Sequence, residues 1–468
     1  MNDLSLPVDV KAWAGRLGPD ALDQLQSINS RYTDMKQQLK RLNTDKGKLS
    51  RRIGEAKKNN TKDEQAIAEI KGISASIKQL NGEVSSLKSA VAAVLAETAA
   101  SNVAPSLPGH FLTADSHAAE SSASATVNIV QVDAAMLEAW NQYVDTHPRS
   151  CVYHRYEFRE IIEQSFGHSC LYLAAYNQQR TICGILPVVQ INSRIFGNYF
   201  VSIPMFNYAG PLADSEQIES QLIEHACTVV AQRGASHLEL RDTKTRQNYQ
   251  QKTSKFAMVR PLPQTAEQLW DEIGAKVRAQ IKRADPHQLQ FSSGGLELLS
   301  DFYRVFSINM RDLGTPVYGK EFFKNILEKT SLNHQIAVVY HCGKPVSCGF
   351  LFNYKGTMDI PWASTLRSAN LLNANMFMYW NILKLSIDAK CQFFDFGRST
   401  KDAGTFKFKK QWGAEPVPLF WHYWLKNGGE LPELNPNNPK YRLVISAWQR
   451  FPIWLTKILG PPLVKNLP

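Results

Sequence analysis

The stretch Phe393-Phe394-Asp395-Phe396-Gly397-Arg398-Ser399, followed by Gly404-Thr405-Phe406-Lys407-Phe408-Lys409-Lys410-Gln411-Trp412-Gly413, organises the interpretation of the whole chain. Its first residues are apolar on both alternating faces, which predicts a strand buried on both sides. After a polar turn, residues 405–408 predict a second short strand, with Phe406 and Phe408 on one face and Lys407 and Lys409 on the other. These lysines could stabilise an anion, or they could be solvated edge charges that discourage sheet-to-sheet pairing.

The composition is that of a basic globular protein. Its 468 residues suggest two to four domains, and 53 Lys and Arg against 42 Asp and Glu give a formal net charge of +11. A basic protein of this size usually meets a polyanion, such as nucleic acid, a membrane surface or a phosphorylated substrate.

Targeting and metal signals are weak. The odd number of cysteines, 7, without a CxxC pair is typical of reduced thiols in a cytosolic protein. Cys151 and His154 have a metal-like spacing, but no second ligand pair accompanies them, so we expect no metal site. The first residues lack the pattern of a signal peptide, and no apolar run of about 18 residues predicts a membrane span.

Residues 20–96 predict an antiparallel coiled-coil hairpin. Apolar residues recur at steps of three and four, with Lys46 filling one position, at Leu25, Ile28, Tyr32, Met35, Leu39, Leu42, Leu49 and Ile53, and again at Ile70, Ile73, Ile77, Leu80, Val84, Leu87, Val91 and Val94. A polar turn at 57–61 joins the two helices. Each arm would reach roughly 40 to 50 Å.

Positive charge is concentrated on the first helix of this hairpin. Between residues 31 and 62, 11 Lys and Arg stand against 3 acidic residues, which favours a phosphate-backbone ligand over a dimerising coiled coil with solvated lysines. The candidate contacts are Lys40, Arg41, Lys48, Arg51, Arg52, Lys57 and Lys58.

The hairpin resembles the N-terminal tRNA-binding arm of seryl-tRNA synthetases. The matching segments are 39–43, 48–53, the turn at 57–58 and the exit at 102–108. The resemblance implies that tRNA is a partner and that tRNA-Ser is the favoured one. Nothing similar to a synthetase catalytic domain follows in the sequence.

The remaining chain predicts a linker and a repeated α/β unit. Residues 97–126 are rich in Ala, Ser, Thr and Pro, as in a flexible linker. Predicted strands lie at 127–131, 170–176, 181–191, 199–203, 237–241, 335–341, 345–354, 357–361 and 393–397. Predicted helices lie at 135–145, 156–165, 215–233, 266–284, 297–312, 320–330 and 370–388. A helix, helix, strand, strand, helix, strand order occurs twice, in units of about 140 residues.

These elements define the expected domains. They are an N-terminal segment at 1–19, the arm at 20–96, the linker at 97–126, α/β units at 127–265 and 266–431, and an amphipathic tail at 432–468. The fold class is therefore α/β (α+β), with two tandem domains behind a helical hairpin. The apolar and basic tail segment 441–459 could lie at a membrane interface or pack against the body of the protein.

The two units resemble the FemAB family, in particular members associated with exosortase/PEP-CTERM and exopolysaccharide systems. The strings that carry the resemblance are 393–399 with 404–413, and 166–168, 202–204, 208–211, 237–241, 311–317, 374–380 and 435–442. It implies tandem acetyltransferase-like (GNAT-like) domains, and characterised members move an amino acid from aminoacyl-tRNA to an amine of a peptidoglycan precursor.

The resemblance also implies site residues. A Phe-Lys pair implicated in stabilising the oxyanion corresponds to Phe408 and Lys409, although Lys407 or Lys410 could serve instead. Arg398 is a candidate anchor for a phosphate or carboxylate of the acceptor. Weaker candidates for substrate binding are Tyr208, Arg241, Arg311 and Tyr379, each of which could equally have a structural role.

Further charged residues have an open role. The basic helix that contains Lys276, Arg278, Lys282 and Arg283 could contact a tRNA acceptor stem or be solvated. Asp395 could take a proton, but a buried, paired aspartate is the safer interpretation.

The leading hypothesis is a tRNA-dependent aminoacyltransferase with seryl-tRNA as favoured donor, cytoplasmic or peripheral at the inner membrane, without a bound cofactor. The acceptor would be an amine or hydroxyl of an envelope or exopolysaccharide precursor, or of a small molecule. One alternative is an acyl-CoA-dependent N-acyltransferase, against which counts the lack of an R/Q-x-x-G-x-G/A loop for the pyrophosphate. The other alternative is a non-catalytic tRNA-binding protein.

Overall fold

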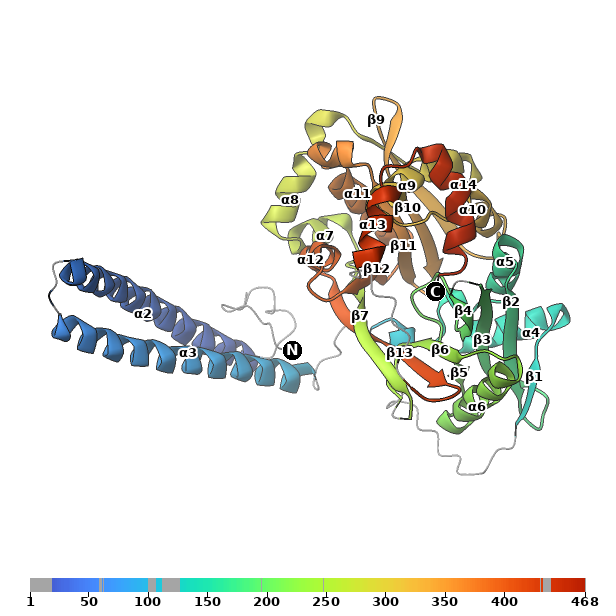
Figure 1. The fold of residues 1–468 in the computed structure, drawn as a ribbon, viewed down its shortest axis with the longest axis horizontal. Coiled ribbons are helices and arrows are strands. Elements are labelled where there is room, and N and C mark those ends of the chain that lie inside the picture. The colour runs from blue at the N-terminus through green and yellow to red at the C-terminus, as the bar shows by residue number, and fades with distance from the viewer. Residues whose placement is uncertain are drawn as a thin grey trace. The chain divides into compact units, whose positions relative to one another are not determined.

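The computed structural model describes residues 19–58, 61, 63–99, 107–111, 127–194, 196–246, 248–429, 431 and 439–467. The chain divides into two compact units, Met1–Ser106 and Leu107–Pro468 (Figure 1). Across the described ranges, no helix combines the length and the apolar character needed to cross a membrane.

The first unit is the predicted helical hairpin. Helix α2 (Pro19–Lys58) packs against α3 (Glu64–Ala99). Leu25, Met35 and Leu49 are buried, as the steps of three and four predict. At the turn, Asp63 accepts a hydrogen bond from the backbone N–H of Ala66 at 2.9 Å and pairs with Arg52 at 2.9 Å, so Arg52 helps to fix the arm tip.

The second unit is built on one mixed sheet. Its strands are β1 (Asn128–Gln131), β2 (Ser169–Tyr176), β3 (Ile182–Ser193), β4 (Gly197–Val201), β5 (Leu212–Ala213), β6 (His237–Asp242), β7 (Gln250–Pro261), β8 (Gln290–Gly294), β9 (His334–His341), β10 (Lys344–Tyr354), β11 (Thr357–Thr365), β12 (Phe393–Thr400) and β13 (Glu415–Leu425). Their order is β1-β2-β3-β4-β6-β13-β7-β12-β11-β10-β9-β8, with β5 paired to β3.

The sheet contains the same arrangement twice. In what we call the first half, α4 (Leu137–Thr146) and α5 (Glu157–Phe166) precede β2, β3 and β4, and α6 (Glu216–Gln232) leads to β6. In the second half, α9 (Leu299–Leu313) and α10 (Lys320–Leu327) precede β9, β10 and β11, and α11 (Ala374–Asp388) leads to β12. Helix α6 connects the parallel strands β4 and β6, and α11 connects the parallel strands β11 and β12. The structure therefore confirms the repeated unit.

The two halves exchange their last strands. Strand β7 ends the first half but pairs with β12 of the second, and β13 ends the second half but pairs with β6 of the first. Strands β13 and β7 also pair with each other, which joins the halves into one sheet.

Side chains alternate between the two faces of this sheet. Along β2, Cys170, Tyr172 and Ala174 join a core with α4, α5, α9 and α10 that spans both halves. Leu171, Leu173 and Ala175 face α6 instead. In the second half, α11, α12 (Gly404–Gln411), α7 (Ala266–Glu272) and α8 (Ala275–Lys282) cover that opposite face.

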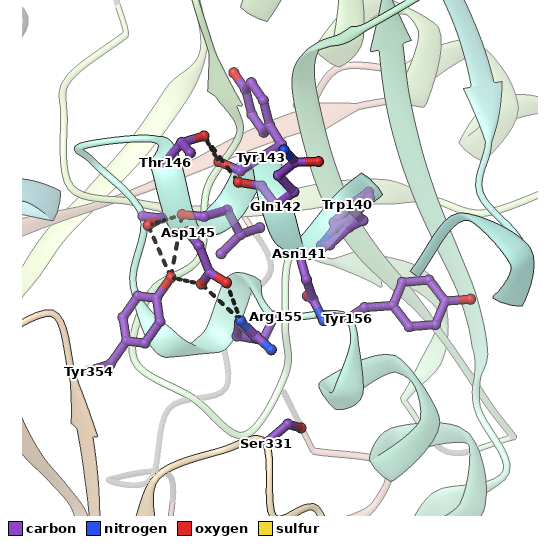
Figure 2. A network of polar contacts seen from close by, with 12 residues as sticks. Trp140, Asn141, Gln142, Tyr143, Asp145, Thr146, Arg155, Tyr156, Ser331 and Tyr354 are labelled. Carbon is purple, nitrogen blue, oxygen red and sulfur yellow. Dashed lines mark hydrogen bonds and ion pairs between the residues drawn. The ribbon is translucent and has the colours of Figure 1, made fainter. Parts of the chain in front are cut away.

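A polar network ties α4 of the first half to the β10–β11 turn of the second (Figure 2). Arg155 donates to both oxygens of Asp145, at 2.8 and 2.6 Å, and Tyr354 donates to the same carboxylate at 2.9 Å. The Lys355 ammonium donates to the carbonyls of Val144 and His147 at 3.0 and 2.7 Å. The contacts fix the two halves relative to each other.

Some predicted elements are wrong. Residues 405–408 form a turn of α12 rather than a strand, because Phe406, Lys409 and Trp412 recur at steps of three and are all buried. A window of four residues is too short to distinguish the two periods. The predicted helix 266–284 is two helices, since Ile273 and Gly274 between them are extended. Strands β7, β8 and β13 were not predicted.

Part of the predicted linker is ordered against the second unit. Residues 109–111 form a short helix, η1 (Gly109–Phe111), with His110 and Phe111 buried. The Thr243 hydroxyl donates to the carbonyl of His110 at 2.6 Å. Of the rest of the predicted linker, the structure describes residues 97–99, at the end of α3, and residues 107–108.

The C-terminal helices α13 (Pro439–Trp448) and α14 (Ile453–Val464) pack against the body on one side. Thr456, Gly460 and Val464 are buried on α14, which contacts α9. On the other side Trp454 and Ile458 are exposed. One side of α14 therefore packs against the body, which was one of the two predicted alternatives, and the other side is exposed.

We predict that Gly460→Ala destabilises the protein. A Cβ at Gly460 would lie 2.9 Å from the backbone N and O of Val317, which cannot move like a flexible side chain. Overpacking of this kind costs about 1–3 kcal/mol. Denaturant unfolding measures the change.

The control is Gly404→Ala, because no atom lies within 4 Å of a Cβ built there. It should be neutral or stabilising, by at most ~1 kcal/mol. Equal stabilities of the two variants would show that α14 does not pack closely against Val317.

Candidate active site

Two acidic residues mark the point where the parallel strands β11 and β12 diverge. Asp359 and Asp395 are register partners, and the pairing of the two strands ends with them. Strand β12 then shifts its register against β7 between Asp395 and Arg398. Gly397 has φ +74°, a conformation that suits glycine, and it forms this irregularity.

The two carboxyl groups are buried and have different surroundings. Asp395 accepts hydrogen bonds from the Tyr208 hydroxyl at 2.6 Å and the Gly397 N–H at 2.8 Å. Asp359 accepts one from Tyr153 through Oδ2, and its Oδ1 has no hydrogen-bond partner in the described part of the chain. Burial raises the pKa of both, that of Asp359 well above its usual value. We therefore assign the charge to Asp395 and the proton to Asp359.

Lys409 reaches the irregularity of β12 from α12. Its ammonium donates to the carbonyls of Gly397 and Arg398, both at 3.0 Å. Burial lowers the pKa of Lys409 to about 8, while the charges of Asp395 and Asp359 favour its protonated form. The ammonium is thus held at the end of the carboxyl pair, where the two strands separate.

The loop after β4 forms the opposite side of the site. Ile203 and Met205 have φ of +51° and +73°, which costs about 1–3 kcal/mol for such residues and is typical of functional loops. The loop places Asn207 beside Gly397: a Cβ built on Gly397 would lie 3.5 Å from Asn207 Nδ2 and 3.9 Å from Lys409 Nζ. The Asn207 amide nitrogen is buried without a hydrogen-bond partner among the residues described.

Tyr208 connects the acidic pair to η1. His110 Nε2 lies 3.2 Å from the Tyr208 hydroxyl, and the two rings stack at 5.2 Å. Burial lowers the pKa of His110 to about 3, so the imidazole is neutral and can donate to Tyr208 while Tyr208 donates to Asp395.

Arg398 and Arg241, which the sequence suggested separately, come together. Both guanidinium groups lie over the ring of Trp421 on β13, with Cζ 5.2 and 4.6 Å from its centroid. The structure thus gathers Lys409, Arg398, Tyr208 and Arg241 around the junction of β6, β12 and β13.

Other predicted residues lie elsewhere. Tyr379 packs against Phe408 at 5.1 Å and Phe396 at 5.5 Å in the apolar core beneath α11. Arg311 pairs with Asp312 at 2.6 Å. Tyr379 and Phe408 therefore contribute to core packing, and Arg311 forms an ion pair within its own helix.

The basic helix α8 is also partly structural. Arg278 donates to carbonyls of Trp270, Asp271 and Ile273 at the end of α7, at 3.0, 3.3 and 2.7 Å. Lys282 lies over the ring of Trp270 at 5.8 Å. The Lys276 and Arg283 side chains are exposed.

The arm presents its predicted cations on one exposed stripe. At about 100° per residue, Lys40, Arg41, Lys48, Arg51 and Arg52 fall within about 120° of the α2 surface. All five are exposed. The Lys57 and Lys58 side chains lie outside those described.

Several site residues escaped the sequence prediction. Asp359 carries a usable signal, because it is an acidic residue within the apolar run Met358-Asp359-Ile360-Pro361-Trp362. Asn207 and Trp421 carry no such signal, and His110 lies in a segment with the composition of a linker.

We predict that Asp359→Asn stabilises the protein at pH 7, by ~1–3 kcal/mol. A carboxyl whose pKa is raised on folding costs nothing below its unfolded pKa, near 3.8, and costs progressively more as pH rises toward its folded pKa. Asparagine carries no charge, so its advantage should shrink as pH falls toward 4. Thermal unfolding at pH 7 and at pH 4 measures this.

The exposed Asp402 gives the control, Asp402→Asn. A gain for Asp359→Asn of equal size at both pH values would contradict the assignment of the buried proton.

The comparisons with known proteins agree with this architecture. Residues 274–410 match the family model of the acetyltransferase (GNAT) domain, and residues 11–98 match that of the seryl-tRNA synthetase N-terminal domain. The crystal structure of FemX is similar with a TM-score of 0.50 at 11% identity, covering 68% of this chain and all 100% of FemX.

A tandem GNAT protein from the clavulanic acid biosynthesis pathway is also similar, with a TM-score of 0.42 at 10% identity over 65% of this chain and 100% of that one. No curated protein matches the sequence. Together, the family matches indicate a GNAT-fold acyltransferase domain behind a seryl-tRNA synthetase-like N-terminal region, and the similarity to FemX shows the fold that the two proteins share.

Proposed function

We propose that the protein transfers an amino acid from aminoacyl-tRNA, with seryl-tRNA as the favoured donor, to an amine or hydroxyl of an acceptor. The acceptor would be an envelope or exopolysaccharide precursor, or a small molecule. The observation that carries the proposal is a pair of N–H donors, Lys409 Nζ and Asn207 Nδ2. Both lie around the space that a Cβ would occupy at Gly397, and glycine leaves this space open.

This pair of donors fits an acyl-transfer transition state. When a nucleophile attacks the ester carbonyl of aminoacyl-tRNA, negative charge develops on the carbonyl oxygen, and N–H groups fixed in advance stabilise it. Lys409 is held by two backbone carbonyls, and so it needs no reorganisation. The attack forms the new bond to the carbonyl carbon and breaks the bond to the ribose oxygen, which leaves as an alcohol.

The same site can manage the proton. The nucleophile loses a proton as it attacks, and the ribose oxygen gains one as it leaves. The carboxyl pair beside Lys409 contains one ionised and one protonated group in our assignment. We place the proton transfer on this pair, with Tyr208 and neutral His110 orienting Asp395.

The donor assignment rests on the arm. Its exposed basic stripe and its match to the seryl-tRNA synthetase N-terminal domain support binding of tRNA. Because aminoacyl-tRNA is made in the cytoplasm, we place the reaction there.

The GNAT acetyltransferase match favours one other donor, acyl-CoA. The same oxyanion-stabilising residues would serve a thioester. The two donors differ in their need for the arm, which is essential only if tRNA carries the acyl group.

We further place the protein at the membrane surface during catalysis. Trp454 and Ile458 on α14 are 63% and 61% exposed, and Leu459 and Leu463 lie beside them at 40% and 37%. Lys457 projects from the same helix over Tyr303. An apolar ridge bordered by positive charge is suited to an anionic lipid surface, where lipid-linked acceptors would be found.

We predict that activity falls above about pH 8. Lys409 loses its proton there because burial lowers its pKa to about 8, and the neutral amine stabilises an oxyanion poorly. Loss of one such donor typically lowers kcat by about 10²–10³-fold. The measurement is the rate at which labelled seryl-tRNA is consumed with a small-molecule extract as acceptor source, corrected for spontaneous ester hydrolysis.

Three variants interpret the result. Lys409→Met should lose activity at all pH values, and Lys409→Arg should keep residual activity without the decline above pH 8. The exposed neighbour Lys407 on the same helix gives the control, Lys407→Met, which should behave as wild type. Full activity of Lys409→Met would exclude the proposed oxyanion site.

We predict that Lys48→Glu together with Arg51→Glu weakens tRNA binding and lowers the slope of log K against log salt by about 2, one unit for each phosphate contact. This variant leaves the Arg52–Asp63 pair at the tip intact. Filter binding of tRNA over a range of salt concentrations, with sequencing of the retained tRNAs, measures both affinity and preference.

The matched control is Lys71→Glu together with Lys78→Glu, which changes the net charge equally on the exposed face of α3. Serine tRNAs should be enriched among those retained. If both variants weakened tRNA binding equally, the arm would bind tRNA only through its net charge. Acyl-CoA would then become the favoured donor.

A further inference from the structure

The exchanged strand β13 brings two arginines from opposite halves to one tryptophan. Trp421 is the register partner of Arg241 on β6, and Arg398 on β12 also lies over its ring. Because β13 inserts between β6 and β7, this triad exists only when both halves are assembled in one sheet. We call Arg241, Arg398 and Trp421 the junction triad.

The junction triad carries unbalanced positive charge. Arg241 donates to Glu239 Oε1 at 2.8 Å, and the other oxygen of Glu239 accepts from Tyr423 at 2.7 Å. Each oxygen of Glu239 therefore already accepts a hydrogen bond, one from Arg241 and one from Tyr423. Arg398 forms no ion pair with any residue that the structure describes, and burial together with the charge of Arg241 lowers its pKa to about 10. The buried Arg241 and the half-buried Arg398 thus have one carboxylate between them.

Three N–H groups of the triad also lack acceptors. Arg241 Nη2, Arg398 Nη1 and Trp421 Nε1 are buried, and none has a hydrogen-bond partner in the described ranges. Arg241 is completely buried and held by Glu239 and by the carbonyl of Phe206 at 2.9 Å, so its free N–H is fixed in direction. Buried donors without acceptors are rare in native structures and call for a bound partner.

The position of the triad relates it to the reaction centre. Arg398 directly follows Gly397, whose carbonyl holds Lys409. Arg241 holds the loop at Phe206, directly before Asn207. Arg398 and Trp421 are partly exposed, which gives a ligand access to the triad.

We propose that the junction triad binds an anionic oxygen group, a carboxylate or a phosphate, of the acceptor substrate. The inference rests on the proposed function, because it assigns the bound group to the acceptor of that reaction. Guanidinium groups present paired N–H donors that match both oxyanions, and the indole N–H adds a further donor. The acceptor is thereby narrowed to molecules that carry such a group near the nucleophilic amine or hydroxyl.

Anion binding to the full-length protein can be measured without tRNA or acceptor. Wild type is titrated with sodium phosphate and, separately, with sodium acetate, at ionic strength held constant with sodium chloride. Calorimetry should show one saturable site for at least one of the two, and the melting temperature should rise with that anion. The stronger of the two anions distinguishes a phosphate from a carboxylate acceptor group.

Variants assign the site. Arg398→Met keeps the length of the side chain but removes its charge, and it should weaken binding at least tenfold while not lowering stability without anion. Trp421→Phe keeps the ring and removes one N–H, and it should weaken binding less. Arg311→Met removes a guanidinium that pairs with Asp312, and it should bind as wild type.

The outcomes separate this inference from the proposed function. No saturable binding of phosphate or acetate, or unchanged binding by Arg398→Met, overturns the inference even if the protein consumes seryl-tRNA. Anion binding that Arg398→Met abolishes supports the triad, and a failure to bind tRNA in the same preparation would then count only against the proposed donor.

Discussion

The insertion of β13 between β6 and β7 is the constraint on which the rest of the second unit depends. Each half gives its last strand to the ladder of the other, so the halves cannot separate without exposing backbone donors and acceptors along two strand pairs. A side-chain interface between domains would allow hinge motion, whereas a shared ladder resists it. The polar network around Asp145 adds a second connection at another place.

This rigidity allows the junction to tolerate polar groups that a looser core would not. Two carboxyls, an ammonium and the Arg241 guanidinium are buried near the ends of β6 and β12, and some of the polar atoms there have no partner among the described residues. The loop before Tyr208 also holds Ile203 and Met205 at positive φ. Such costs persist only where the surrounding structure fixes them, and they are typical of sites whose partners arrive with a ligand.

The sequence predicted the elements whose signal is local. The heptad steps of the arm and the apolar runs of β2, β3 and β12 are readable within ten residues, and the structure confirms them. Strands β7 and β13 escaped prediction because their partners are far away in sequence and their own composition is mixed. For the site, motif resemblance named Lys409, Arg398, Tyr208 and Arg241, but it could not show that β13 brings two of them to Trp421.

The two halves differ in the surroundings of an equivalent acidic residue. Each parallel strand pair has an acidic residue at the third position of its second strand, Glu239 on β6 and Asp395 on β12. Each oxygen of Glu239 accepts a hydrogen bond, one from Arg241 and one from Tyr423. Asp395 instead has a second carboxyl, Asp359, as its neighbour.

The cation beside the carboxyl pair Asp395 and Asp359 is a lysine, Lys409, rather than an arginine. An arginine keeps its charge at neutral pH, whereas a buried lysine can have its pKa lowered toward neutrality, as that of Lys409 is. The acidic residue of the first half is thus bound by an arginine and a tyrosine, whereas that of the second half lies beside a carboxyl and a lysine whose pKa values are shifted by burial. The GNAT match falls on this second half, at residues 274–410, while the first half supplies Asn207, Tyr208 and Arg241 to the shared site. Both repeats, locked together by β13, therefore contribute residues to one shared site.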